Sequence, residues 1–169
     1  MKLSTRKLCI LSLLLALNVA ISSVYIPITP DLHIEFTFII VMYIACNFSL
    51  PECLIFATLE DLLTYFLFQS SQWPFFPGYT LSAIVGILIY YAFLHKKVTI
   101  LRTAVSKTLV NILVNIGLGS LWNSMMYGKA FLYYASISIV KNLVLLPFEI
   151  IAFYIIYKAL EPITKKYLH

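Results

Sequence analysis

The feature that most restricts this chain is a succession of long apolar runs with very little polar sequence between them. The first run extends from Leu8 to Ile26, and others follow to the last residues. A helix needs about 20 mostly apolar residues, at about 1.5 Å rise each, to cross a bilayer core about 30 Å thick. Only 11% of the 169 residues are charged, against about 25% in a typical soluble domain. The chain is therefore expected to be a single all-α integral membrane domain, residues 1–169.

Six transmembrane helices are predicted from the apolar runs and from the residues that interrupt them. Pro27 and Pro30 end the first run, because proline lacks the backbone donor that a helix uses. The second run is short, so its helix is expected to extend through the polar stretch 31–35 or to be tilted. A tight turn at Ser49 is expected to place Pro51 near the start of the third helix. The predicted helices cover about 8–26, 36–48, 51–68, 80–94, 103–121 and 132–160.

The distribution of Lys and Arg orients the predicted bundle. With the N-terminus inside, ten of the twelve basic residues, Lys107 included, lie on the cytoplasmic side, and only Lys129 and Lys141 lie toward the outside. Such an excess of basic residues marks cytoplasmic segments, so both termini are predicted to be cytoplasmic. The basic groups flank apolar runs instead of forming one polar face, which argues against nucleic acid as a partner despite the net charge of +5.

The connections after the first, third and fifth predicted helices then face outward, and they are rich in aromatic residues. Segment 69–79 includes Pro77 and Gly78, and both this segment and 122–129 are expected to be ordered loops. Aromatic rings near an interface are often membrane-belt residues, yet rings this dense also suit a wall that stacks on a flat ligand. A passive channel or structural bundle would leave these outer loops unexplained, so capture of an external solute is favoured.

No catalytic or metal-binding motif is present. The sequence has no H-E-x-x-H, no G-x-S-x-G and no phosphate-binding Gly-rich loop, so the chain is not expected to be an enzyme or to hydrolyse ATP itself. Cys9, Cys46 and Cys53 lack C-x-x-C spacing and lie in or beside apolar runs. They are expected to be packing residues, with no disulfide, no bound metal and no cofactor.

Glu60 and Asp61 lie in the middle of the third predicted helix. Charged groups at membrane depth usually face the bundle interior or a hydrated cavity. Adjacent helical residues point about 100° apart, so the two carboxyls do not share one direction. Contact of Asp61 with a substrate and an internal hydrogen bond to Asn or Ser of a neighbouring helix are equally open. An intramembrane enzyme that uses either carboxyl is the alternative function from another class.

Further polar residues lie in the last two predicted helices. Asn111 and Asn115 share one face, where they either join two helices or contact the edge of a heterocycle. Lys141, followed by Asn142, either extends to the headgroups or meets an anionic ligand, and the aromatic loop before it favours the ligand. Glu149 is expected to bond backbone groups freed by the proline two residues before it.

Residues 76–83 (FPGYTLSA) resemble the F-P-G-[FY]-T-L-S-A signature of the folate-type S components, the substrate-binding subunits of energy-coupling factor (ECF) vitamin transporters. Three further stretches agree in order and spacing. Residues 121–130 resemble the family's L-W…Y-G-K-A, and residues 141–149 resemble its K-N…[LI]-P-x-E. Ala16 and Ala20 match its A-x-x-x-A motif, so the resemblance covers nearly the whole chain.

The resemblance implies a non-catalytic, multi-pass subunit of a prokaryotic plasma membrane that captures folate or a related pterin at its outer face. Its partners would be a transmembrane coupling protein and two ATPases, and Ala16 with Ala20 would be the docking surface for the coupling protein. Together with the outward rings and polar groups, the motifs predict a substrate pocket. Its expected residues are His33, Asp61, Phe76, Gly78, Tyr79, Ser82, Asn115, Trp122, Lys141 and Asn142.

Two positions depart from the family's pattern, because His33 and Ser138 stand where it has arginine. Arginine binds carboxylates in a bidentate way that neither His nor Ser reproduces, and folate has two carboxylates on its glutamate tail. The class of subunit is unaffected by these changes. Its substrate remains open between folate and another vitamin such as pantothenate, pyridoxine or a queuosine precursor.

Overall fold

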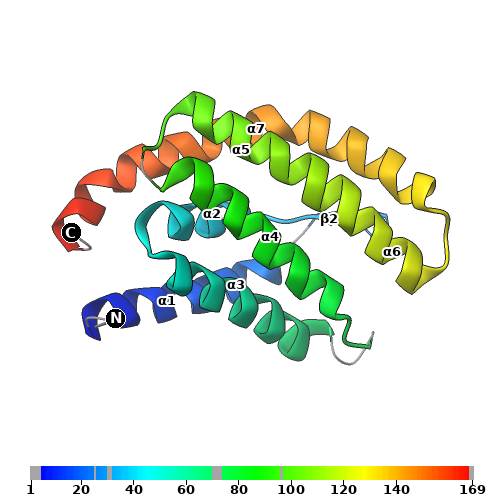
Figure 1. Ribbon diagram of the computed structural model, residues 1–169, viewed down its shortest axis with the longest axis horizontal. Coiled ribbons are helices and arrows are strands. Elements are labelled where there is room, and N and C mark those ends of the chain that lie inside the picture. Colours follow the sequence, from blue (N-terminus) through cyan, green and yellow to red (C-terminus); the bar gives the residue numbers. More distant parts are fainter. Residues whose placement is uncertain (1–4, 25, 30–31, 70–73, 96, 168–169) are drawn as a thin grey trace.

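The computed structural model describes residues 5–24, 26–29, 32–69, 74–95 and 97–167, with the backbone alone at 27–29, 32–34, 69 and 165–167. Most of this is helix, and the helices lie alongside one another in an elongated bundle (Figure 1). The start of α1 and the end of α7 lie at the same end of the bundle. The elements are α1 (Thr5–Ser22), β1 (Ile26–Thr29), β2 (Leu32–Ile34), α2 (Phe38–Asn47), α3 (Leu50–Thr64), the π-helix η1 (Tyr65–Gln69), α4 (Pro77–Leu94), α5 (Ile100–Val110), the π-helix η2 (Asn111–Leu118), α6 (Gly119–Tyr127) and α7 (Phe131–Tyr167).

Within the described residues, four helices are long and apolar enough to cross a membrane. They are α1, α4, the continuous rod Ile100–Tyr127 formed by α5, η2 and α6, and the stretch Phe131–Thr164 of α7. The shorter helix α2 is also apolar. The sequence-based prediction of a helical membrane bundle is therefore confirmed at this level.

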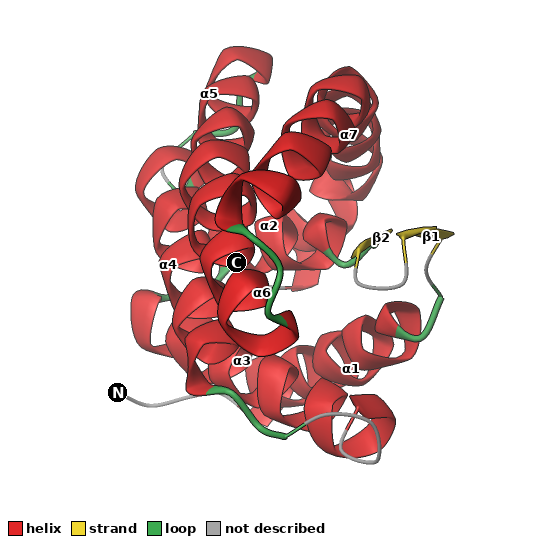
Figure 2. Ribbon diagram, turned by 90° about the vertical axis from the view of Figure 1, so that its right-hand side faces the viewer, coloured by secondary structure: helices red, strands yellow, loops and turns green. Residues whose placement is uncertain are grey.

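The first outward segment departs from the prediction. Strands β1 and β2 pair antiparallel, with Ile26 opposite Ile34 and Pro27 opposite His33, and the hairpin lies between α1 and α7 (Figure 2). Of the two alternatives for the second helix, extension through the polar stretch is wrong, because β2 occupies Leu32–Ile34 and α2 begins only at Phe38. β-branched residues favour extended backbone and proline disfavours helix, which explains the hairpin.

The predicted turn before the third helix is confirmed. Ser49 is the N-cap of α3, Pro51 lies in its first turn, and the Ser49 N–H donates to Glu52 Oε2 at 2.7 Å. This is the backbone half of a capping box, and it provides an acceptor for a helix-end donor that would otherwise be unpaired. The sharp turn lets α3 run back against α1, α2 and α4.

The short helix α2 occupies the centre of the bundle. It packs against α1, α3, α4 and α7, and the side chains of Met42, Ile44 and Ala45 are fully buried. Cys46 and Cys53 are buried in the same core, Cys9 is exposed, and all three thiols are free. The absence of a disulfide among them is as predicted, and two of the three are packing residues.

The second expected loop, 122–129, is largely helical, whereas in the described part of 69–79 residues 74–76 are irregular and helix is found at residue 69 and from Pro77 onward. Pro77 begins α4, so Pro77 and Gly78 form its first turn instead of a loop, since proline suits the first helical position, where its missing N–H is not needed. Trp122 lies inside α6, which continues to Tyr127 and ends at Gly128 with φ 74°. Aromatic residues alone do not indicate a loop. Segment 122–127 contains neither glycine nor proline, so α6 continues until Gly128. Trp73 lies outside the described residues.

The exterior of the bundle is apolar. Leu132, Leu101 and Phe148 have 77%, 71% and 70% of their surface exposed, and many other large apolar side chains of α1, α5 and α7 are also exposed. Patches of this extent are incompatible with a free surface in water. The surface therefore suits contact with lipid.

Candidate functional site

An aromatic wall is built where α4 begins beside α6, at the end of the bundle opposite the start of α1 (Figure 1). The ring centroids of Phe76 and Trp122 are 5.4 Å apart, and those of Phe76 and Tyr79 are 5.9 Å apart. Trp122 Nε1 donates to Ser82 Oγ at 2.9 Å, and the Tyr79 hydroxyl donates to Asn123 Oδ1 at 2.7 Å. These two hydrogen bonds join α4 to α6 and fix the orientation of the rings.

Gly78 allows the rings of Phe76 and Trp122 to pack closely against the start of α4. A Cβ placed on Gly78 would lie 2.8 Å from Trp122 Cδ2 and would overlap the Phe76 ring. Real carbon atoms do not approach this closely, so a side chain at this position would push the two rings aside. The requirement for glycine comes from close packing, since its φ lies in the helical range.

We expect Gly78→Ala to lower the free energy of unfolding by about 1–3 kcal/mol, which is the usual cost of overpacking. Tryptophan fluorescence in a Trp73→Phe background should also shift, because Trp122 is then the remaining indole. Gly86→Ala is the matched control, since a Cβ at Gly86 meets no atom within 4 Å. Equal effects of the two substitutions would show that the contact with the wall is not the cause.

The two carboxyls of α3 point in different directions, as their spacing predicts. Asp61 accepts a hydrogen bond of 2.5 Å from the Thr80 hydroxyl of α4. Glu60 lies near the fully buried Asn18 of α1, although within the described residues neither polar atom of the Asn18 amide has a hydrogen-bond partner. Asp61 is half-buried and bonds to the residue of α4 that directly follows Tyr79, while Glu60 belongs to the contact between α1 and α3.

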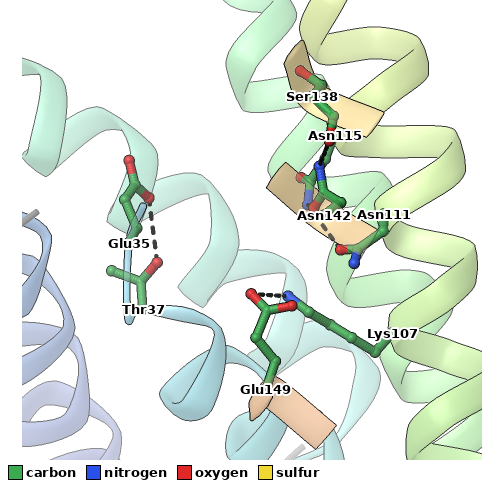
Figure 3. A network of polar contacts seen from close by, with 8 residues as sticks. All are labelled: Glu35, Thr37, Lys107, Asn111, Asn115, Ser138, Asn142 and Glu149. Atoms are coloured by element: carbon green, nitrogen blue, oxygen red, sulfur yellow. Dashed lines mark hydrogen bonds and ion pairs between the residues drawn. The ribbon is translucent and has the colours of Figure 1, made fainter. Parts of the chain in front are cut away.

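An amide ladder joins the rod to α7 (Figure 3). Asn115 Nδ2 donates to Asn111 Oδ1 at 3.0 Å and to Asn142 Oδ1 at 3.1 Å. Asn142 Nδ2 in turn donates to the Ser138 carbonyl at 2.7 Å. The sequence left two roles open for Asn111 and Asn115, a link between helices and contact with a heterocycle. The structure contains the link between helices, through the bond from Asn115 to Asn142. Both residues lie in η2, and π-helical turns occur frequently at functional sites.

A buried ion pair lies below the ladder (Figure 3). Lys107 Nζ is 3.1 Å from Glu149 Oε1, and the two side chains are 4% and 13% exposed. The ammonium also lies 4.5 Å from the centre of the Phe38 ring. The prediction for Glu149 is therefore wrong, because Glu149 pairs with a lysine instead of with backbone groups, and Lys107, which was counted among the cytoplasmic basic residues, is buried in the bundle. The bare count of basic residues by segment does not distinguish an inward-facing lysine from an exposed one.

Lys141 is half-buried among acidic residues. It lies within electrostatic range of Glu35 and Glu149, and Glu35 also accepts a 3.4 Å hydrogen bond from the Thr37 hydroxyl. The side chain is neither fully exposed nor excluded from solvent. Contact of Lys141 with an anionic ligand therefore stays a prediction.

Most of the predicted pocket residues are described, and they lie on α3, at the start of α4, and on η2, α6 and α7. The exception is His33, whose side chain lies outside the described part of the chain. Sequence reasoning missed Asn123, Thr80 and Glu35 as partners of the predicted residues, although Asn123 follows Trp122 directly and was available as a polar neighbour. Ala16 and Ala20 are exposed on α1.

An apolar helical bundle that holds rings, amides and carboxyls between its helices is typical of a multi-pass membrane protein. Residues 6–157 match the family model described as "ECF transporter, substrate-specific component". The chain belongs to this family, as the motifs predicted.

Individual relatives agree with this assignment. A folate transporter FolT of Leuconostoc mesenteroides is 31% identical over 156 residues, covering 88% of this chain and 83% of the relative. A folate transporter FolT of Clostridium novyi is 31% identical over 134 residues, covering 79% and 77%. The crystal structure of FolT bound with folic acid superposes with a TM-score of 0.80 at 31% identity, covering 89% of this chain and 92% of that one.

Proposed function

We propose that this protein is the six-span substrate-binding subunit of an ECF importer and that it captures folate or a related pterin at the extracellular side of a prokaryotic plasma membrane. In this arrangement α2 and α3 supply the two spans beyond the four long ones, and both termini are cytoplasmic. The position of the start of α1 and the end of α7 at one end of the bundle, with the wall at the other, supports this topology. ATP hydrolysis belongs to the two partner ATPases, and the subunit itself is not an enzyme.

The observation that carries the proposal is the wall of Phe76 and Trp122, held in place by the bond from Trp122 to Ser82. A flat heterocycle stacks on such a surface with little loss of side-chain freedom. Asp61 offers carboxylate oxygens to ring N–H groups, and the amides of Asn115 and Asn142 offer both donors and acceptors. Lys141 supplies positive charge for an anionic part of the ligand. His33 and Tyr79 complete the proposed pocket.

The test is binding by the purified chain, measured by titration calorimetry with folic acid, pterin, pantothenate, pyridoxine and queuosine precursors. Tight binding of folic acid or pterin, with no response to the others, is the expected result. Tight binding of another vitamin alone would keep the class of subunit and replace the substrate. Failure to bind any of these compounds would overturn the capture function.

Assembly with the coupling protein is proposed to use the small-residue face of α1. Ala16 and Ala20 lie four residues apart and are exposed, so a partner helix can approach closely there. Ala16→Trp is expected to abolish pull-down of the coupling protein and the ATPases and to leave folic acid binding unchanged. Ala92→Trp, on exposed surface of α4, is the matched control and should assemble normally. Unchanged pull-down of the Ala16→Trp variant would show that the docking face lies elsewhere.

A further inference from the structure

A surface groove lies between the end of α4 and the start of α5, far from the aromatic wall. It has a volume of about 490 Å³ and is lined by Ala92, Phe93, Leu101, Arg102 and Val105. We propose that this groove binds one anionic phospholipid, with the phosphate on Arg102 and an acyl chain along the apolar lining. The proposal requires insertion in a membrane, and it holds whichever vitamin the subunit binds.

The charge of Arg102 is the first reason. Its side chain is exposed, and Nη1 donates to the Phe93 carbonyl oxygen at 3.4 Å, which holds the guanidinium across the groove. Among the described residues no carboxylate pairs with it, so most of its N–H donors are available. Arginine is well suited to phosphate because its planar fork offers parallel donors. The exposed Lys97 lies on the same connection and adds positive charge.

The apolar lining is the second reason. Leu101 is 71% exposed and Val105 is 40% exposed, and both flank the groove on α5. The small side chain of Ala92 leaves room at the floor of the groove on α4. A hydrocarbon chain placed there would cover apolar surface along one side of both helices. The combination of one cation suited to phosphate and an adjoining apolar lining matches an anionic glycerophospholipid better than a free anion.

The location is the third reason. The turn between α4 and α5 lies at the end of the bundle where α1 begins, which the proposed topology places at the cytoplasmic interface, where basic pockets between helices bind anionic headgroups. Figure 1 and Figure 2 place α5 on the opposite side of the bundle from α1. The groove is therefore separate from the Ala16 and Ala20 face that is proposed for the coupling protein, and a lipid is the occupant that fits.

The experiment is native mass spectrometry of the purified full chain with an equimolar mixture of phosphatidylglycerol and phosphatidylcholine. We expect one phosphatidylglycerol to be retained in preference to phosphatidylcholine. Arg102→Gln should lower this preference about fivefold, which is the order of effect of one basic side chain at an anionic surface. Ala92→Trp fills the groove and should remove the bound lipid whatever its charge. Lys158→Gln is the matched control, because Lys158 is exposed and already paired with Glu161 at 3.0 Å.

Three results would overturn the proposal. Equal retention of both lipids by the native chain would leave only non-specific annular lipid. Displacement of phosphatidylglycerol by millimolar inorganic phosphate would indicate a simple anion site. Loss of coupling-protein pull-down in Arg102→Gln, with lipid retention unchanged, would assign the groove to a protein partner. Folic acid binding should be unchanged in all three variants, so failure of this proposal is distinguishable from failure of the proposed function.

Discussion

Replacement of Lys107 by methionine is expected to lower the free energy of unfolding by about 3–5 kcal/mol, because it leaves a carboxylate buried without its counter-ion. Glu149 is 13% exposed, and its Oε1 atom lies 3.1 Å from Lys107 Nζ. Its other oxygen, Oε2, is already buried with no hydrogen-bond partner among the residues that the structure describes. The substitution also removes the ammonium from the Phe38 ring. Unfolding in mixed micelles, followed by circular dichroism, measures the change.

The control for this prediction is the double variant Lys107→Met with Glu149→Leu. Replacing both members of a buried ion pair by apolar residues of similar size is often neutral, and it can be stabilising. Most of the lost stability should therefore return. Lys158→Met, which breaks the exposed pair with Glu161, should have no measurable effect. A double variant as unstable as the single one would show that the site requires charge for another reason.

Trp122→Ala is expected to weaken folic acid binding roughly 10–100-fold, since stacking of a flat heterocycle on an aromatic side chain contributes about 1–3 kcal/mol. The substitution removes half of the wall and leaves the Ser82 hydroxyl without its donor. Calorimetric titration measures the affinity. Far-ultraviolet circular dichroism confirms that the helices remain, because Trp122 lies in a helix held by its own backbone bonds.

Trp122→Phe separates the two contributions of this residue. It keeps a ring for stacking but loses the N–H that donates to Ser82, so its affinity should fall between those of the native chain and of Trp122→Ala. A Trp122→Ala variant that binds folic acid as tightly as the native chain would place the ligand away from this wall. Binding that is weakened equally in both variants would indicate that the fixed orientation of the ring matters more than its area.

The sequence predicts the parts of this structure that depend on local rules. The turn at Ser49 and Pro51 was predictable because the capping residues lie within four positions of each other. The boundaries at Pro77 and Trp122 were not, because proline both ends helices and begins them, and aromatic rings occur in helices and loops alike. Composition and the family motifs together predicted the class of protein.

Contacts between residues distant in the chain could not be predicted in the same way. Lys107 and Glu149 belong to different helices, and only the packing of α5 against α7 brings them together. The bond between Tyr79 and Asn123 likewise depends on how α4 meets α6. The candidate site was therefore predictable as a set of residues, whereas the partner of each residue was not.

The π-helix η2 determines how the side chains of α6 are rotated about the rod axis relative to those of α5. Its i→i+5 turns take up more residues than α-helical turns do, so the faces of α5 and α6 are out of phase with those of one uninterrupted α-helix. This offset lets Lys107 point at α7 while Trp122 points at α4. If one residue were lost from η2, every side chain beyond it would rotate by about 100°. The direction in which Trp122 faces and the direction in which Lys107 faces therefore depend on the same π-helical segment between them.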